Sequence, residues 1–391
     1  MRLPQESQLS KEQREVMFAK AEGTTVVVGP PGSGKTVIAI FRARNMKERG
    51  KTVESLVYNR VLSVFTETDS TFYVWLGRWW KKVTGSTHPK IFIPGQWRPP
   101  DFVAMKNQVV GDGKSDFRSK GRWGHLIIDE AQDFPNECHA FLSSLQNVTF
   151  HGLGKEATSL MILADENQRL TDENSTIGEI LAIHLKDGDD AYPLRKNYRN
   201  TQEIAKLASR FYVGLQTGIP ELPEERQGQK PRSTTTADVD EAVSKIKTYV
   251  KNHDNEEIGV LVQYDNTRQK LYNKLKHHLP NAVRVQTFSG TKKHRGKYPA
   301  GDLVFDKKGV VTVLCFASSK GLEFDAVFLP ELQTLRVDAS NSDVAKMTLY
   351  VMCSRARTYL ELMVSDEKGE AAIWEYLPKK TDDVLTFSSR G

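Results

Sequence analysis

The chain is poor in cysteine and lacks any long apolar run. Its 391 residues include three cysteines, Cys138, Cys315 and Cys353, and their separation does not match a zinc or redox motif. We therefore expect reduced thiols and no bound zinc. No apolar stretch is long enough to span a bilayer, and the first residues are too polar for a secretory signal. The sequence predicts a cytoplasmic protein that does not enter a membrane.

The overall composition is that of a globular protein with a basic surplus. Hydrophobic residues make up 39% of the chain, which is enough to build the cores of two or more domains at this length. The net charge of +6 favours acidic partners, among which nucleic acid is the most common. Charge alone does not identify the partner, so we count it only where basic residues lie close to aromatic ones.

A buried-strand pattern followed by a glycine-rich loop lies near the start of the chain. The β-branched run Thr24–Val28 leads into GPPGSGKT at 29–36, which matches the phosphate-loop spacing Gly-x-x-x-x-Gly-Lys-Thr. An apolar helical pattern follows and ends at Gly50. The order of strand, loop and helix is the one that a phosphate-binding loop requires. These residues predict a nucleoside triphosphate site.

The residue types in this loop suit ATP and Mg²⁺. Gly32 and Gly34 let backbone amides approach phosphate oxygens, and the following helix directs its N-terminal donors at the same anion. Lys35 is suited to the β- and γ-phosphates, and the hydroxyl of Thr36 is suited to Mg²⁺.

A short helix is predicted before the first strand, and its Gln13 has two candidate roles. Ser10 and Gln13 have the spacing of a capping box, in which each side chain bonds the other residue's backbone N–H. The amide of Gln13 is equally suited to the adenine edge, because it both donates and accepts. The residues alone leave both roles open.

Two further apolar strands end in polar residues. Leu126–Ile128 leads into Asp129 and Glu130, at the carboxyl end where open α/β sheets bind ligands. Asp129 is suited to contact Mg²⁺, and Glu130 to polarise the water that attacks the γ-phosphate. The strand 159–164 is followed by the polar run 165–168, where a γ-phosphate sensor is expected.

The segment 71–85 is dense in aromatic residues and ends in lysines. On a helix, Phe72, Trp75 and Trp79 form one stripe, which is either a core face or a platform for single-stranded nucleic acid. The stretch 86–122 is rich in proline, glycine and lysine, so we predict a loop-rich insertion. Its basic residues are either solvated or part of a phosphate track; they are Arg118, Lys120 and Arg122.

A composition shift at 186–193 predicts a domain boundary, with one domain at 1–190 and another at 191–391. The second domain has no phosphate loop. Apolar strands alternate there with helical segments, which predicts a second parallel sheet. These strands are expected at 258–263, 283–288, 310–316, 326–330 and 360–364. If this half takes part in ATP chemistry, it does so through arginines, and Arg199 and Arg355 are the candidates.

Several motifs stand in an order that resembles the UvrD/Rep-like group of superfamily 1 helicases. They are GPPGSGKT, IIDEAQD, LADENQ, NYRNT, SSKGLEFDAVFLPEL and LYVMCSRAR, and together they span both halves. DEAQD and KGLEF are more specific than the phosphate loop alone. The resemblance implies a compact member with reduced accessory subdomains. It implies two RecA-like P-loop domains with parallel sheets and an ATP site in the cleft between them.

The resemblance also implies roles for individual residues. Lys35 and Thr36 would bind phosphate and Mg²⁺, Asp129 the metal, and Glu130 would be the catalytic base. By the same resemblance, the γ-phosphate sensor would be Gln168, the phosphate-contacting arginines Arg199 and Arg355, and the nucleoside contacts Gln13, Tyr198 and Glu323.

The strand-binding residues depart from the family pattern. The aromatics that commonly follow Gln168 in the family are replaced here by RLTDE, and Cys315 and Ala317 stand where Thr and His are common. Phe72 falls at a strand-contacting position, and Trp79 is a second candidate. The basic segment around Lys292 and Lys293 is either a solvated loop or a phosphate contact.

The implied function is an ATP-hydrolysing, nucleic-acid-stimulated helicase or translocase. It would need ATP and Mg²⁺ and would act 3′ to 5′ on a single strand, with DNA favoured slightly and an RNA-directed motor left open. The alternative is an ATP-gated subunit that recruits or regulates a nuclease, repair or defence complex without unwinding alone.

Overall fold

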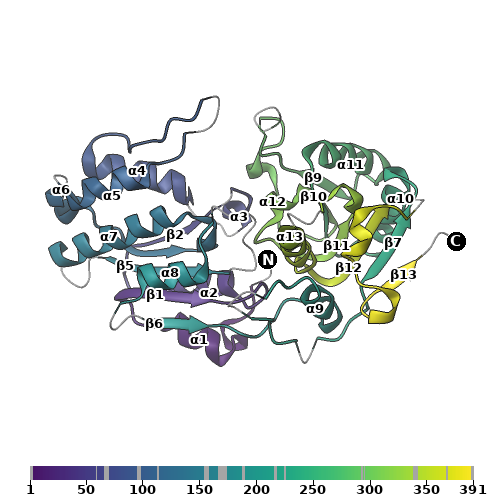
Figure 1. Cartoon of the computed structure of the whole chain (residues 1–391), viewed down its shortest axis with the longest axis horizontal. Helices are drawn as coiled ribbons and strands as arrows, with labels where there is room; N and C mark the ends of the chain where they lie inside the picture. Colours follow the sequence, from purple (N-terminus) through teal and green to yellow (C-terminus); the bar gives the residue numbers. More distant parts are fainter. Residues whose placement is uncertain are drawn as a thin grey trace. The chain divides into compact units, whose positions relative to one another are not determined.

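A computed structural model describes most of the chain. The described residues are 3–58, 60–65, 70–94, 98–111, 114–153, 158–165, 174–186, 190–214, 218–223, 226–291, 294, 296–337, 342–366 and 369–388. They divide into two units. The N-terminal unit contains residues 3–29 and 34–194, and the C-terminal unit contains residues 30–33 and those from 195 onward. Each unit is an α/β body around its own sheet (Figure 1).

The sheet of the N-terminal unit is six-stranded and parallel, with the order β3-β2-β4-β5-β1-β6. Its strands are β1 (Gly23–Val28), β2 (Val53–Val57), β3 (Ser70–Thr71), β4 (Gly124–Ile128), β5 (Thr158–Ala164) and β6 (Asp190–Pro193). The neighbours of β1 in the sheet are β5 and β6, which come much later in the chain. Helical crossovers therefore connect the strands, as parallel pairing requires.

Helices cover both faces of this sheet (Figure 1). They are α1 (Lys11–Met17), α2 (Lys35–Glu48), α3 (Arg60–Phe65), α4 (Phe72–Thr84), α5 (Phe102–Val110), α6 (Lys114–Lys120), α7 (Asn136–Leu153) and α8 (Ile177–His184). Val26 packs into a core with α4, α5, α7 and α8, whereas Val27 packs into a second core with α1 and α2. Because successive side chains point to opposite faces, the uninterrupted apolar strands feed both cores.

The sheet of the C-terminal unit is seven-stranded and parallel, with the order β13-β7-β12-β11-β8-β10-β9. Its strands are β7 (Arg232–Thr236), β8 (Glu257–Val262), β9 (Arg284–Thr287), β10 (Val310–Cys315), β11 (Phe324–Leu329), β12 (Ala356–Ser365) and β13 (Thr386–Ser388). Its helices are α9 (Gln202–Ser209), α10 (Val239–Asn252), α11 (Asp265–His278), α12 (Phe316–Ser319) and α13 (Ser342–Cys353). The apolar stripes of α10 and α11 pack on Val260, Val313 and Phe328.

The predicted fold class is confirmed, since both units are mixed α/β with parallel sheets. The apolar strands predicted in both halves are present at nearly the predicted bounds. The strands β3, β6, β7 and β13 were not predicted. All four are short, and β7 reads RSTTT, which lacks the apolar residues on which the prediction depended.

The prediction of a loop-rich insertion at 86–122 was wrong for its second half. Residues 102–110 and 114–120 form α5 and α6, which contact α7. Phe102, Met105 and Val109 recur at helical spacing and are buried, and Phe117 is buried from α6. The high content of proline, glycine and lysine obscured this short apolar stripe.

No helix among the described residues is both long and apolar enough to cross a bilayer.

The aromatic residues of α4 are a structural centre of the N-terminal core, and Trp80 is fully buried within it. Its ring centroid lies 5.1 Å from that of Phe117, and among the described residues its indole N–H has no hydrogen-bond partner. Replacement of Trp80 by alanine should therefore lower the free energy of unfolding through lost packing alone, by about 3–5 kcal/mol. Chemical denaturation measures this loss. Val74→Ala on the exposed face of the same helix is the control, and it should change stability by less than about 1 kcal/mol. A loss below about 1 kcal/mol for Trp80→Ala would contradict the assigned core.

Candidate nucleotide site

Glycine is required at two positions of the loop between β1 and α2. Gly32 and Gly34 have φ of 83° and 90°, in the left-handed region that side chains disfavour. A Cβ atom at Gly34 would lie 2.4 Å from Nε2 of Gln13, and one at Gly32 would lie 2.3 Å from Oδ1 of Asn197. The left-handed backbone therefore favours glycine at both positions, and a larger residue would also have to displace the ends of these two side chains.

Lys35 and Thr36 connect this loop to neighbouring strands. The ammonium of Lys35 donates to the carbonyl of Gly29 at 2.6 Å and lies 3.3 Å from the carboxylate of Asp165, which follows β5. The hydroxyl of Thr36 donates to Oδ2 of Asp129 at 2.6 Å. The carboxyl ends of β1, β4 and β5 thus deliver a cation, a hydroxyl and two carboxylates to one edge of the sheet.

The paired carboxylates after β4 are deeply buried. Asp129 and Glu130 are 2% and 3% exposed. Burial, together with the adjacent charge of Glu130, raises the pKa of Asp129 to about 6, although the hydrogen bond from Thr36 and the charge of Lys35 oppose this shift. Glu130 also has a left-handed backbone, with φ 54° and ψ 42°. This conformation is uncommon for a residue with a side chain and is characteristic of functional sites.

Gln132 and His139 hold this arrangement in place and were not identified as site residues from the sequence, whereas Asp165 belongs to the polar run predicted after β5. The amide of Gln132 donates to Oε2 of Glu130 at 2.6 Å and accepts from the backbone N–H of Asp165 at 2.9 Å. One ring nitrogen of His139 lies 3.0 Å from the carbonyl of Ala131, and because a carbonyl only accepts, that nitrogen donates. Gln132 and Asp165 lie within DEAQD and LADENQ, so those motifs already contained the signal. His139 had none.

The capping box at the start of α1 is present. Gln13 accepts from the backbone N–H of Ser10 at 3.0 Å, and Ser10 accepts from that of Gln13 at 3.2 Å. The Gln13 amide is at the same time packed against Gly34 of the phosphate loop. The cap therefore fixes this amide beside the loop, and its predicted contact with adenine stays a prediction.

Other candidates lie outside the described residues. These are Gln168, Lys292 and Lys293.

Within the C-terminal unit, Arg199 and Glu323 come together. Nε of Arg199 lies 2.6 Å from one oxygen of Glu323, and a nitrogen of Arg357 lies 2.6 Å from the other. These two charges hold the pKa of Glu323 down at about 2 despite its burial. Tyr198, next in the chain to Arg199, is 38% exposed. The sequence analysis named three of these four residues but not Arg357, which lies two positions after Arg355.

Arg355 is not part of this ion-paired group. Its side chain is fully buried and donates to the carbonyls of Val351 at 2.9 Å and Leu322 at 3.1 Å. In this arrangement the guanidinium connects the end of α13 to the loop before β11.

Phe72 and Trp79 are core residues. They are 0% and 6% exposed, and Trp79 stacks on Trp75 with ring centroids 5.6 Å apart. The sequence left a core face and a base-stacking platform open, and the structure shows the core face. Neither ring presents a free face, so the expectation of strand stacking loses its support at these two positions.

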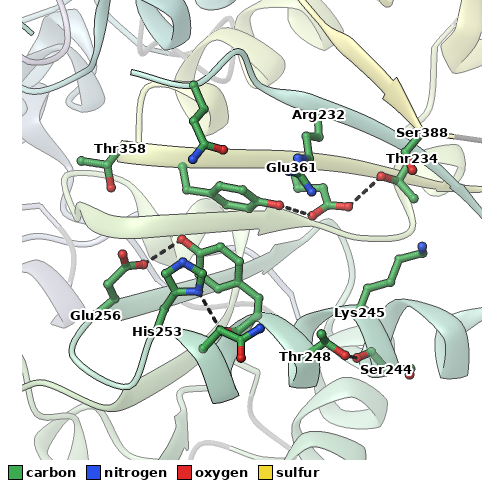
Figure 2. Close-up of a pocket in the computed structure, with 14 residues that line it drawn as sticks. Arg232, Thr234, Ser244, Lys245, Thr248, His253, Glu256, Thr358, Glu361 and Ser388 are labelled. Carbon is green, nitrogen blue, oxygen red and sulfur yellow. Dashed lines mark hydrogen bonds between the residues drawn. The ribbon is translucent and has the colours of Figure 1, made fainter. Parts of the chain in front are cut away.

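The C-terminal unit also has a pocket of about 610 Å³ at the amino-terminal end of β7 and β12 (Figure 2). Its buried carboxylate, Glu361, accepts from the hydroxyls of Tyr359 and Thr234, both at 2.6 Å. Arg232 and Lys245 on the same lining offset the charges of Glu361 and Glu256. The pocket is thus balanced in charge, and its carboxylate has two partners already.

Comparison with known proteins places the chain in a class. The sequence model described as Schlafen group 3, DNA/RNA helicase domain, matches residues 22–343, which is more than half of the chain. The chain therefore belongs to this family of helicase domains. No curated protein matches the chain significantly.

One solved structure similar to this chain is the C-terminal domain of a possible DNA helicase from Lactobacillus plantarum WCFS1. It is 20% identical, and the match covers 48% of this chain and 97% of that one, with a TM-score of 0.32. This similarity is too low to support an assignment by itself.

Breaking the ion pairs of Glu323 should lower the free energy of unfolding. Glu323→Gln leaves Arg199 and Arg357 without their shared charge, and we expect a loss of about 2–3 kcal/mol in the free energy of unfolding at pH 7. The pKa of Glu323 is about 2 in the folded chain and near 4.5 in the unfolded chain. Its ion pairs therefore stabilise the fold fully above pH 4.5, and this stabilisation is lost as the pH falls toward 2. The difference between wild type and variant should therefore shrink across this window. Urea denaturation at pH 7 and pH 3 measures it, and an equal difference at both would contradict the ion-pair assignment.

Proposed function

We propose that the chain is an ATP-hydrolysing translocase or helicase of the UvrD/Rep-like superfamily 1 type, acting 3′ to 5′ on single-stranded DNA. One observation carries this proposal: the phosphate loop, Thr36, Asp129 and Glu130 converge on the carboxyl edge of one sheet. Membership of a helicase-domain family is consistent with it. The motifs in the second half supply the remaining support.

The donor set fits Mg²⁺. The hydroxyl of Thr36 and the carboxylate of Asp129 are hard oxygen ligands 2.6 Å apart, and Mg²⁺ is typically held by one or two such groups together with phosphates and water. When bound, the ion would offset negative charge on the phosphates. Lys35 would exchange its bonds to Gly29 and Asp165 for phosphate oxygens. Burial and, second, the charge of Glu130 raise the pKa of Asp129, and a bound cation would favour its charged form.

Glu130 is the proposed base. Its carboxylate would accept a proton from the water that attacks the γ-phosphate, and Gln132 holds one of its oxygens in place. The left-handed backbone at Glu130 turns the chain sharply after β4, which places Asp129 and Glu130 in different surroundings. One carboxylate can then serve the metal while its neighbour serves the water.

The C-terminal unit would respond to the nucleotide through the arginines around Glu323. We assign Tyr198 to the adenine ring, Glu323 to the ribose, and Arg199 and Arg355 to the transferring phosphate, with Gln168 as sensor. Arg199 would leave its ion pair with Glu323 to do so. Charge stabilisation by a second unit makes hydrolysis depend on closure, which is how such a motor couples ATP to movement.

A non-unwinding subunit is the second candidate. The burial of Phe72 and Trp79 favours it, because a strand motor grips bases on exposed aromatics. Such a subunit would bind ATP and nucleic acid and would recruit a nuclease, repair or defence partner. The family description also admits RNA as the nucleic acid.

Two substitutions separate binding from turnover. Lys35→Ala should abolish ATP hydrolysis and weaken ATP binding, because the phosphate charge loses its cation. Glu130→Gln should lower turnover by at least about 100-fold while ATP still binds, because only the base is removed. Phosphate release and binding of a fluorescent ATP analogue measure the two effects.

The same assay tests the motor against the alternative. ATP turnover by the wild type should rise on addition of single-stranded DNA, and 3′-tailed substrates should be displaced in preference to 5′-tailed ones. Equal turnover with and without DNA and RNA would rule out a nucleic-acid motor. Stimulation without strand displacement would favour the non-unwinding subunit.

A further inference from the structure

A second hollow in the N-terminal unit lies at the edge of the sheet opposite to the nucleotide site. It measures about 470 Å³ and is bordered by residues at the amino-terminal ends of β1, β2, β4 and β5 and by the last turns of α2, α4 and α6. A strand rises about 3.3 Å per residue, so the length of β4 places roughly 15 Å between this edge and Asp129. The hollow is therefore separate from the phosphate loop.

Basic side chains dominate the rim of this pocket. Lys51, Lys82, Lys120 and Arg122 line it, against one acidic residue, Glu22. Lys120 is paired with Asp116 at 2.9 Å, so its charge is already partly offset. Lys82 and Arg122 form no ion pair or side-chain hydrogen bond within the part of the chain that the structure describes.

The floor of the pocket is rigid and uncharged. The indole N–H of Trp123 donates to the carbonyl of Ser159 at 3.1 Å, and a ring nitrogen of His125 lies 2.6 Å from the hydroxyl of Ser159. Burial and the nearby charge of Arg42 lower the pKa of His125 to about 3, so this ring is neutral near pH 7. The positive charge thus lies on long side chains at the rim, and the floor of the pocket is polar and hydrogen-bonded.

We propose that this pocket binds phosphate groups of a nucleic-acid strand, as a contact distinct from the nucleotide site. The inference rests on the proposed function in that the chain acts on nucleic acid. Exposed lysine and arginine side chains drawn from separate segments suit a polyanion, because they release its counterions without having to form a closed, desolvated cage. They specify no base, so the contact is expected to be independent of sequence.

A phosphate contact in this pocket gives a role to basic residues that are not part of the nucleotide site. Lys120 and Arg122 are two of the three basic residues that the sequence left open between solvation and a phosphate track; the third, Arg118, does not line the pocket. They lie far in sequence from Lys51 and Lys82, and the fold brings all four to one hollow. A contact here would let the N-terminal unit hold the strand throughout the ATP cycle, since none of these residues belongs to the ATP-responsive motifs.

The test is a triple charge reversal, Lys51→Glu, Lys82→Glu and Arg122→Glu, in the full chain. The matched control reverses three exposed lysines of the C-terminal unit, Lys251, Lys307 and Lys308. Both variants change the net charge equally. The readout is fluorescence anisotropy of a labelled single-stranded DNA without nucleotide, titrated at several salt concentrations, with thermal denaturation to confirm folding.

The pocket variant should bind DNA at least about 10-fold more weakly than the control variant. The slope of log K against log salt should also fall by about 2, because each lost phosphate contact removes about 0.7 for a single strand. ATP turnover without DNA should stay unchanged, since the nucleotide site is untouched. The three single variants, Lys51→Ala, Lys82→Ala and Arg122→Ala, should each show a smaller loss and serve if the triple variant does not fold.

Different outcomes overturn different conclusions. Equal affinity and equal salt slope for the pocket and control variants would remove the pocket from the nucleic-acid contacts and leave the proposed function intact. Absence of DNA and RNA binding by the wild type would instead remove the proposed function. Loss of binding to anionic vesicles, with DNA binding retained, would assign the pocket to a different partner and contradict the inference.

Discussion

Both units depend on one constraint: a parallel sheet covered by helices on its two faces buries its strands, so charged groups that must reach a ligand or solvent lie mainly where the strands end. In the N-terminal unit the strands are buried along their length, so Lys35, Asp129 and Asp165 emerge together at the carboxyl edge. The same constraint collects Lys51, Lys82 and Arg122 at the opposite edge. The sheet thereby separates the proposed nucleotide site from the basic pocket within one unit.

Buried charge at the nucleotide site is tolerated because each charged group has a partner. Lys35 faces Asp165, Asp129 accepts from Thr36, and Glu130 accepts from Gln132. Two neighbouring carboxylates at 2% and 3% exposure are still costly, and the raised pKa of Asp129 reflects that cost. Such preorganised strain is characteristic of sites that gain a cation and a phosphate on binding. In the C-terminal unit, Glu323 likewise has two charged partners, Arg199 and Arg357.

Arg355 and Arg357 lie two positions apart in the sequence but have different surroundings in the fold. Arg355 is fully buried and bonded to backbone carbonyls, whereas Arg357 shares Glu323 with Arg199. The motif SRAR presents both at nearly the same place in the sequence. If Arg355 contacts phosphate as the family resemblance implies, its bonds to Val351 and Leu322 must first be exchanged. Arg357 needs no such rearrangement, because it already stands in the ion cluster.

The sequence alone determined the phosphate loop, the apolar strands and the fold class, because glycine spacing and runs of β-branched residues are local signals. It also selected Asp129 and Glu130, since they directly follow such a strand. Only the tertiary structure decided that Phe72 and Trp79 face the core, because a helical stripe has the same period whether it packs on a sheet or on a base. The pairing of Lys35 with Asp165 and the gathering of distant basic residues in one pocket also required the fold, since each joins segments that no local pattern connects.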